Sequence, residues 1–421
     1  MIKFTKHYLM FVLAISLNGI SQTNNEFLNQ INTQFQPDTA YIQEEVCVLL
    51  TKKSELAVAW IDRKKGTDEK LISYTISYQN KTKWYPIRTY DSKEFIWTGN
   101  PAFAEDDNNN IYLVSMSIDY FTNHIPTAAI LEICKTQDGG QNWSDWTTIK
   151  RNNDLGSNMP DKPTIIAKGD GELFLSYINF NLPEGKFLEA KGDVVFTKST
   201  DHGKTWSNNI LIDNKRGWKP NTIFKMILTG EADMGEQGPS LSFVGNNILL
   251  SYGSYKGKGI WLTISEDLGN SFGEVKRIAK TETPLPVTDI ITDNKNRIII
   301  TVFNPHGVGK AYILESNDGG KTFEKPKCIS KNASLLTGNF DQKGNVILLW
   351  NEKTKENVDT KYMVIGKDGE KSYSLYSDKK PITKFYIGAY QDLVVDENNI
   401  IHLFWIDWSI EGGKLIYSTC K

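Results

Sequence analysis

The stretch Ser316-Asn-Asp318-Gly-Gly320-Lys-Thr-Phe323 decides the fold, because its pattern recurs along the chain. The pattern is Ser/Thr-x-Asp-x-Gly-x-x-Trp/Phe. Complete and degraded copies, in chain order, begin at Ser77 (degraded), Thr136, Ser199, Ser265, Ser316 and Gly366 (degraded). Their starts lie 59, 63, 66, 51 and 50 residues apart. A motif at such a period predicts an array of repeated structural units.

Each copy has the chemistry of a tight turn. The Asp carboxylate can accept backbone N–H bonds of its own turn. The Gly can adopt a positive φ that other residues resist. The aromatic residue at the end can re-enter a sheet and pack there. We therefore interpret each copy as a structural turn and expect no catalytic role for it.

The pattern resembles the Asp-box (BNR) repeat of the sialidase superfamily. The copies span nearly the whole chain beyond a short N-terminal leader. The resemblance implies an all-β fold, a β-propeller. It implies much less about activity, because one fold supports many functions.

Residues 1 to 21 have the features of a secretory signal peptide. Lys3 and Lys6 precede a short apolar run from Tyr8 to Leu17, which is too short to span a bilayer, and small residues follow near Ser21. A buried N-terminal strand is the alternative. We expect a signal peptide over 1–21, a single β-propeller domain over 22–421, and a secreted (periplasmic or extracellular) protein.

Composition narrows the range of partners. The net charge of −2 gives no sign of nucleic-acid binding, and no other apolar run approaches 18 residues, so we expect no membrane insertion. Four scattered cysteines show no metal-site spacing: Cys47, Cys134, Cys328 and Cys420. We expect buried free thiols, with one disulfide as the alternative, no metal site and a monomer. The sequence leaves any cofactor unknown.

The rest of the chain reads as strands. Apolar runs joined by turns rich in Asn, Asp and Gly recur in sets of four, and we label the strands of each set A, B, C and D in chain order. We predict a β-propeller of four-stranded antiparallel blades, which leaves only short protected edges. Seven blades are favoured if the first set starts at Val46, and six stay open. The last set lacks strand D, which the segment before Val46 could supply.

The alternating strand directions assign the loops to two faces. All A–B turns and C–D turns, including the Asp-boxes, share one face and are short. The B–C and D–A loops share the other face and are longer; the longest runs over 27 residues from Asp213 to Pro239. Long irregular loops in compact domains usually carry function. We therefore place the functional site on the B–C/D–A face, over the central channel.

Histidine and arginine supply the main candidates on that face. His124 and His306 fall on B–C loops, and neutral imidazole is suited to proton transfer. Arg63, Arg151 and Arg216 map to the same face, where a guanidinium can grip a carboxylate. Solvated surface residues are the alternative for each. By contrast, His202 lies inside an Asp-box, and His402 has the context of a satisfied core residue.

Other residues are candidates for binding a sugar. Lys162 belongs to Asp161-Lys162-Pro163, which resembles an element of Asp-box proteins of uncertain function. Glu236 lies where a strand A begins. Several aromatic side chains could stack on sugar rings, with core packing as the alternative: Trp97, Tyr120, Trp218, Tyr255 and Trp408.

The resemblance implies sialidase-type site residues that this chain has only in part. Sialidases use an arginine triad, an early Arg-Ile-Pro element, a Tyr/Glu nucleophile pair and an acidic Asp; no Arg-Ile-Pro occurs here. The histidines, tyrosines and arginines are more similar to those of propeller polysaccharide lyases and rhamnosidases.

Our leading hypothesis is a secreted carbohydrate-active enzyme for an anionic, uronate-containing oligo- or polysaccharide, acting by β-elimination as a lyase or dehydratase. His124 or His306 would remove the proton, Tyr255 would protonate the leaving oxygen, and Arg216 or Arg63 would neutralise the carboxylate. An exo-sialidase-like glycoside hydrolase that uses Glu236 is one alternative. A non-catalytic glycan-binding propeller is the other.

Overall fold

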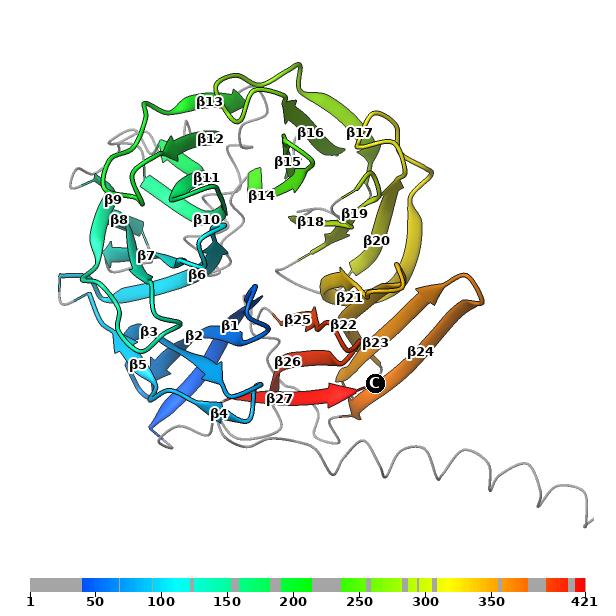
Figure 1. Ribbon diagram of the computed structural model, residues 1–421, viewed down its shortest axis with the longest axis horizontal. Helices are drawn as coiled ribbons and strands as arrows, with labels where there is room; N and C mark the ends of the chain where they lie inside the picture. Colours follow the sequence, from blue (N-terminus) through cyan, green and yellow to red (C-terminus); the bar gives the residue numbers. More distant parts are fainter. Residues whose placement is uncertain are drawn as a thin grey trace, which may run out of the picture.

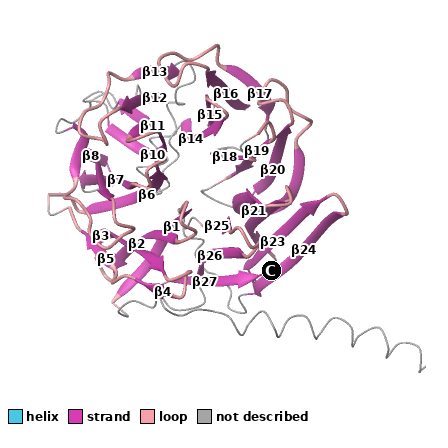
Figure 2. Ribbon diagram, in the orientation of Figure 1, coloured by secondary structure: helices cyan, strands magenta, loops and turns pink. Residues whose placement is uncertain are grey.

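The computed structural model describes residues 40–67, 69–92, 94–121, 125–152, 159–181, 191–213, 236–254, 259–281, 287–293, 295–304, 309–354, 358–377, 391–407 and 413–420. All regular elements of these ranges are β-strands, as Figure 2 shows. Within the same ranges, no helix is long and apolar enough to cross a membrane. The all-β prediction is confirmed.

Local sequence explains why the inner strands form. Strand β19 (Ile298–Phe303) reads IIITVF, and all of its residues are buried. β-Branched residues favour the extended backbone, and an uninterrupted apolar run is typical of a strand covered on both faces. Polar turns with Asn, Asp and Gly end these runs.

The strands follow the predicted A–B–C–D order. Strand A is β1 (Tyr41–Leu50), β6 (Trp97–Glu105), β10 (Met159–Lys168), β14 (Glu236–Val244), β18 (Val287–Thr292), the second half of β21 (Lys327–Phe340) and β25 (Asp392–Val395). Strand B is β2 (Leu56–Lys64), β7 (Ile111–Phe121), β11 (Glu172–Asn181), β15 (Asn247–Ser254), β19, β22 (Val346–Lys353) and β26 (Ile401–Asp407). Strand C is β3 (Lys70–Tyr78), β8 (Ile125–Thr136), β12 (Lys191–Ser199), β16 (Gly259–Ser265), β20 (Gly309–Ser316), β23 (Val358–Gly366) and β27 (Lys414–Cys420). Strand D is β4 (Lys83–Trp84) with β5 (Arg88–Tyr90), β9 (Thr147–Asn152), β13 (Ile210–Asp213), β17 (Lys276–Lys280), the first half of β21, and β24 (Gly369–Ser377).

Neighbouring strands of a set pair antiparallel, as in β10-β11-β12-β13. Two larger sheets each join two sets. One is linked by a single parallel pair between Lys70 and Trp97. The other is linked by β21, whose first half pairs with β20 and whose second half pairs with β22. Four-stranded antiparallel blades are thus confirmed, and the number of blades stays a prediction.

The sets are arranged around a ring with the A strands innermost (Figure 1). The first and last sets meet directly. The N–H of Val48 donates to Asp392 Oδ2 over 2.7 Å, and the N–H of Leu415 donates to Gln43 Oε1 over 2.6 Å. Trp60 of β2 and Phe404 of β26 belong to one buried cluster, so the two ends of the chain share a core.

The structure corrects one detail of the predicted ring closure, the start of the first strand. Strand β1 begins at Tyr41 and not at Val46, and its first residues pair with β2, so they belong to strand A of the first set. In the described residues the last set has three strands, β25, β26 and β27, as predicted. An added strand from residues 1–39, and the predicted signal peptide, lie outside the described residues.

Candidate functional site

The Asp-boxes form the predicted turns between strands C and D. Ser316 Oγ donates to Asp318 Oδ1 over 2.8 Å and accepts the N–H of Gly320 over 3.0 Å, while the N–H of Thr322 donates to Asp318 Oδ1 over 2.9 Å. The other complete copies repeat these bonds. The hydroxyl and N–H of Thr322 hold the pKa of Asp318 down to about 2. Phe323 packs on the core between neighbouring sets. The boxes are structural, as expected.

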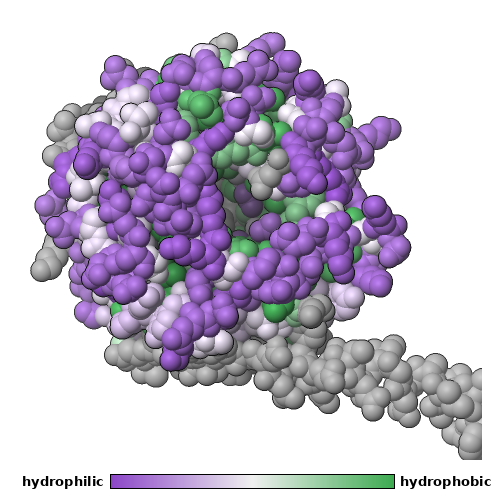
Figure 3. All heavy atoms as spheres, in the orientation of Figure 1, coloured by the Kyte–Doolittle hydropathy of each residue, from purple (hydrophilic) through white to green (hydrophobic). Residues whose placement is uncertain are grey.

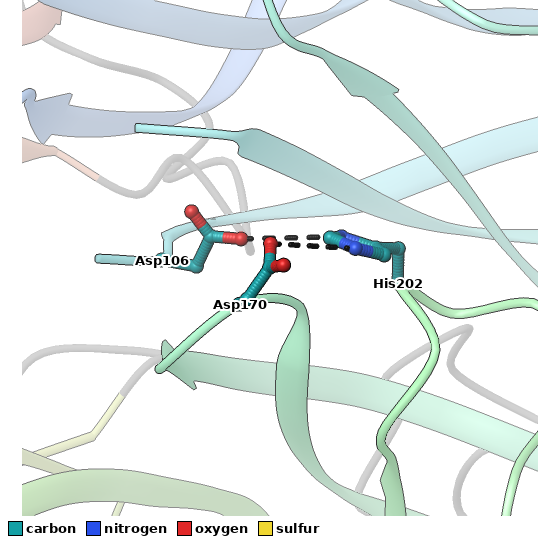
Figure 4. Close-up of side chains that lie close together, drawn as sticks. All are labelled: Asp106, Asp170 and His202. Carbon is teal, nitrogen blue, oxygen red and sulfur yellow. Dashed lines mark ion pairs between the residues drawn. The ribbon is translucent and has the colours of Figure 1, made fainter. Parts of the chain in front are cut away.

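A second polar cluster lies on the same face. Figure 4 shows Asp106, Asp170 and His202, whose potential ligand atoms lie within 4.8 Å of one another. Asp106 is fully buried. Its Oδ2 accepts hydrogen bonds from the Asn110 amide, the Tyr112 hydroxyl and the Gly171 N–H. The cluster ties neighbouring turns together, and its buried carboxylate is already satisfied by the protein.

The central cavity is the candidate site. It has a volume of about 250 Å³ at the middle of the ring, where Figure 3 shows a hollow with a mostly hydrophilic rim and apolar residues deeper inside. Its lining comes mostly from the first half of each inner strand and includes Phe303 at the end of strand β19. The cavity therefore lies toward the B–C/D–A face, on which we placed the functional site.

β-Bulges in the inner strands shape the cavity wall. The pairing register shifts at Glu45-Val46, Asn100-Pro101, Lys162-Pro163, Gly238-Pro239 and Leu335-Leu336. A bulge leaves a residue unpaired and turns its side chain out of the regular alternation. All five of these pairs line the cavity. The repeated bulge is thus the local device that points selected residues at the channel.

Three carboxyl groups line the cavity, those of Glu45, Asp289 and Asp392, and Asp161 precedes the lining residue Lys162 in the chain. Burial raises the pKa of Glu45 to about 7, against the opposing effect of Lys162. Burial, with the nearby charge of Asp289, raises the pKa of Asp392 to about 7. Burial also raises the pKa of Asp161 and of Asp289.

Hydrogen bonds fix most of these carboxyl groups. Asp161 Oδ1 accepts the Asn100 amide over 3.0 Å and the Lys162 N–H over 2.8 Å. Ser240 Oγ donates to Asp289 Oδ1 over 3.2 Å, and the Thr337 hydroxyl lies 3.4 Å from Asp289 Oδ2. Glu45 differs, because its Oε2 is buried without a hydrogen-bond partner among the described residues. A protonated carboxyl group held in this way can donate a proton to a bound molecule.

Lys162 is the predicted site residue that lines the cavity. Arg63 and Arg151 do not line it: Arg63 Nε pairs with Glu44 at 2.8 Å, and Arg151 pairs with Glu94 at 2.7 Å. Glu236 is the first residue of β14, and its side chain lies outside the described residues. The other candidates also lie outside the described residues: His124, His306, Tyr255, Arg216, Trp218 and Trp408. Their roles stay predictions.

Sequence reasoning missed Glu45, Asp289, Gln391 and Asp392. One usable signal was present. Proline interrupts three inner strands, at Pro101, Pro163 and Pro239, and proline inside a strand marks an edge or a bulge. Aligning these prolines between sets would have pointed to Asn100 and Lys162, and to Glu45 at the equivalent position of the first set. It gives no signal for Asp289, Gln391 or Asp392.

Other expectations met mixed outcomes. His402 is 2% exposed and bonds to Tyr417 and Asp396, which confirms it as a satisfied core residue. All four cysteines are free. Cys134 and Cys420 are buried, but Cys328 is exposed and Cys47 lines the cavity, so burial was predicted correctly for only part of the group.

Comparisons with known proteins identify the fold. No protein-family model and no curated protein matches the sequence. The Hadza microbial sialidase Hz136 superposes with a TM-score of 0.51 at 16% identity, over 74% of this chain and 63% of that chain. The chain thus spans less than two thirds of that protein. The leech intramolecular trans-sialidase complexed with 2,7-anhydro-Neu5Ac has a TM-score of 0.50 at 12% identity, over 93% of this chain and 70% of that chain.

A Penicillium chrysogenum α-L-arabinanase complexed with arabinobiose has a TM-score of 0.49 at 14% identity, over 82% of this chain and 98% of that chain. At these identities the comparisons show the fold alone. The chain has a sialidase-like β-propeller fold. The expected closeness to polysaccharide lyases and rhamnosidases gains no support from them.

Proposed function

We propose that the chain is a carbohydrate-active enzyme that hydrolyses glycosidic bonds at the central cavity. The observation that carries the proposal is the pair Glu45 and Asp392, two carboxyl groups in one cavity whose pKa values are raised to about 7. Glycosidases need one carboxylic acid that keeps its proton near neutral pH and a second carboxylate facing it.

Roles follow from the surroundings of each group. Glu45 is the proton donor for the leaving oxygen, because its Oε2 has no hydrogen-bond partner among the described residues. Asp392 and Asp289 form the facing carboxylate pair. Asp392 accepts the N–H groups of Val48 and Leu393, over 2.7 and 2.8 Å, and these bonds stabilise its charged form. Because the charge of Asp289 opposes that of Asp392, one member of the pair ionises before the other, and that member supplies negative charge where positive charge develops on the sugar.

We favour hydrolysis because the described carboxyl groups can supply it, and β-elimination stays the alternative hypothesis. Elimination depends on His124, His306, Tyr255 and Arg216, which all lie outside the described residues. The anionic substrate was argued in part from Arg63 and Arg151, whose ion pairs hold them away from the cavity lining. Export of the mature protein remains part of the proposal and rests on the leader sequence.

Incubation of the purified protein with a panel of neutral and uronate-containing saccharides tests the proposal. We expect new reducing ends without the ultraviolet absorbance of an unsaturated uronate. Glu45→Gln should lower kcat/KM by about 10²- to 10⁴-fold, the usual contribution of a general acid. In the wild type, activity should fall as the pH rises above about 7, because Glu45 then loses its proton.

The matched control is Asp368→Asn, an exposed carboxylate in the turn between β23 and β24, which should retain full activity. Ultraviolet-absorbing products would establish elimination and contradict the hydrolase. Saccharide binding with no products at all would leave a glycan-binding propeller.

A further inference from the structure

The wall of the central cavity is divided into two arcs. The arc from β25 through β1 and β6 to β10 presents all the charged and amide side chains of the described lining except Asp289, those of Gln391, Asp392, Glu45, Asn100 and Lys162. Val46, Pro101 and Pro163 lie between them. The arc from β14 to β21 presents mainly apolar side chains, those of Pro239, Val287, Phe303, Leu335 and Leu336. Ser240, Thr288, Asp289 and Thr337 also belong to this second arc. A molecule that fills the cavity therefore meets more charged and amide groups on one side and more hydrocarbon on the other.

The polar groups of the apolar arc are already satisfied. Asp289 accepts the hydroxyl groups of Ser240 and Thr337, and the Thr288 hydroxyl pairs with that of Ser251 over 2.9 Å. This arc has little need of polar groups from a ligand. It offers the contact surface that the C–H face of a sugar ring would cover.

The polar arc, by contrast, holds unsatisfied acceptors. Gln391 is 5% exposed and donates its amide N–H to the Leu335 carbonyl over 2.8 Å, but its Oε1 has no partner among the described residues. Glu45 Oε2 is in the same state. A buried acceptor without a donor costs about 1–3 kcal/mol. Both atoms require a ligand that brings hydrogen-bond donors.

Charge narrows the ligand further. The cavity is lined by the carboxyl groups of Glu45, Asp289 and Asp392, and Lys162 is the cation in the described lining. Asp161, the residue before Lys162, adds a further carboxyl group close to Glu45. Above about pH 7, where Glu45 and Asp392 are ionised, a sugar carboxylate cannot donate a hydrogen bond to Glu45 or Gln391, and it adds a like charge in a poorly solvated space. A sugar hydroxyl meets neither obstacle.

We propose that the central cavity binds one neutral sugar unit and excludes its uronate counterpart. The hydroxyls of the unit donate to Gln391 Oε1 and Glu45 Oε2, and its C–H face lies on Phe303 and Leu335. The volume of about 250 Å³ lies below the roughly 300–1,000 Å³ of pockets for drug-sized ligands, so the cavity holds a single ring. This inference rests on the cavity proposed as the catalytic site and names its substrate class.

Matched pairs of methyl glycosides test the proposal in binding alone. Methyl glucoside and methyl glucuronide differ only in the oxidation of one exocyclic carbon, as do methyl galactoside and methyl galacturonide. We expect at least one neutral member to bind in calorimetry and to raise Tm, and its uronate partner to bind more than tenfold less tightly. A uronate that binds as well as its neutral partner, or a failure of both pairs to bind, overturns the proposal.

Two variants locate the binding. Gln391→Leu should weaken binding of the neutral sugar about ten- to hundredfold, whereas Gln342→Leu, in the turn that begins strand β22 on the opposite face, should not change it. At pH 8, where Glu45 is ionised, Glu45→Gln removes one negative charge and should raise the affinity for the uronate relative to the neutral sugar by roughly tenfold. This ratio is informative even if Gln391→Leu does not fold.

An unchanged affinity ratio in Glu45→Gln would contradict the charge argument. Binding of a neutral glycoside with no cleavage of any saccharide supports the subsite while the proposed hydrolysis fails. Cleavage of uronate-containing saccharides alone, without binding of a neutral unit, would support the proposed hydrolysis and contradict the neutral subsite.

Discussion

Backbone strain is concentrated where single residues meet the cavity. Glu45, Asn100, Lys162 and Leu335 have φ values of 46, 51, 50 and 58°, in the left-handed region that side chains other than glycine rarely adopt. All four line the cavity. Such strain persists only where the surrounding structure enforces it, and it is often found at functional sites. The bulge position therefore has a cost in stability that a purely structural strand would avoid.

The buried carboxyl group of Asp392 also lowers stability, and its effect depends on pH. Asp392 ionises near pH 3.8 when exposed and near pH 7 in the folded chain. Between these values the unfolded state releases the proton first, so stability falls as the pH rises, and the loss is complete above about pH 7. Asp392→Asn cannot ionise. We expect the free energy of unfolding of this variant, relative to that of the wild type, to rise by about 2–4 kcal/mol as the pH increases from 4 to 8.

Urea unfolding of both proteins across this pH range measures the gain. The control Asp368→Asn changes an exposed carboxylate and should follow the wild type at every pH. A gap between Asp392→Asn and the wild type that stays constant with pH would show that Asp392 titrates normally in the folded state.

The element scale shows how one turn survives the loss of its motif. The degraded copy at Ser77 has Gln79 where the other copies have Asp. Glu55, from the turn between β1 and β2, replaces the missing carboxylate. It accepts the Ser77 hydroxyl over 2.6 Å and the N–H groups of Asn80 and Lys81 over 3.0 Å each. The turn is still held by a carboxylate although its sequence pattern has decayed, but through other N–H groups than those that the Asp carboxylate binds in the complete copies.

Removal of the Glu55 carboxylate should lower the free energy of unfolding, and a second substitution should restore part of the loss. Glu55→Ala leaves two N–H groups without their acceptor, and we expect a loss of about 1–3 kcal/mol in the free energy of unfolding. Adding Gln79→Asp restores a carboxylate at the position used by the other copies and should recover part of the loss. Glu69→Ala, which breaks an exposed ion pair with Lys64, should cost about 0–1 kcal/mol. No recovery in the double variant would contradict the equivalence of the two carboxylates.

The elements were predictable because their signals are local. A few adjacent residues are enough to predict the conformation of each element. Examples are the box at Ser316, the apolar run of β19 and the Asn-Asp-Gly turns. The site was not, because each cavity residue comes from a different strand. Val48 and Asp392 are hydrogen-bonded but 344 positions apart in sequence. An acidic residue such as Asp392, beside an ordinary apolar run, gives no sign that it is buried or whose charge it meets.

At the scale of the whole molecule, one face of the ring is structural and the other carries the candidate site. The C–D turns hold rigid hydrogen-bonded boxes, whereas the opposite face opens to a cavity with unsatisfied acceptors. The face could be predicted, because antiparallel order alone decides which turns lie together. The polar and apolar arcs of the cavity could not, because they depend on which sets become neighbours when the ring closes.

Ring closure joins elements from the two ends of the chain. Gln43 in β1 is fully buried; its Oε1 accepts the N–H of Leu415, and its own N–H donates to the Gly413 carbonyl over 3.3 Å. Gln43→Ala should cost about 1–3 kcal/mol, because the N–H of Leu415 loses its acceptor in a buried site. The loss should appear as faster amide hydrogen exchange in both β1 and β27, which lie 372 positions apart at this contact.

A buried bond inside one set provides the comparison for ring closure. The Thr197 hydroxyl donates to the Ser207 carbonyl over 2.8 Å within the third set, and Thr197 is buried. Thr197→Ala should destabilise the protein to a similar extent but raise exchange mainly in β12 and its Asp-box turn. Opening of the ring at its seam would be local before it is global, because the other sets keep their own sheets and cores. Equal acceleration in every set of Gln43→Ala would instead mean that the ring unfolds only as one unit.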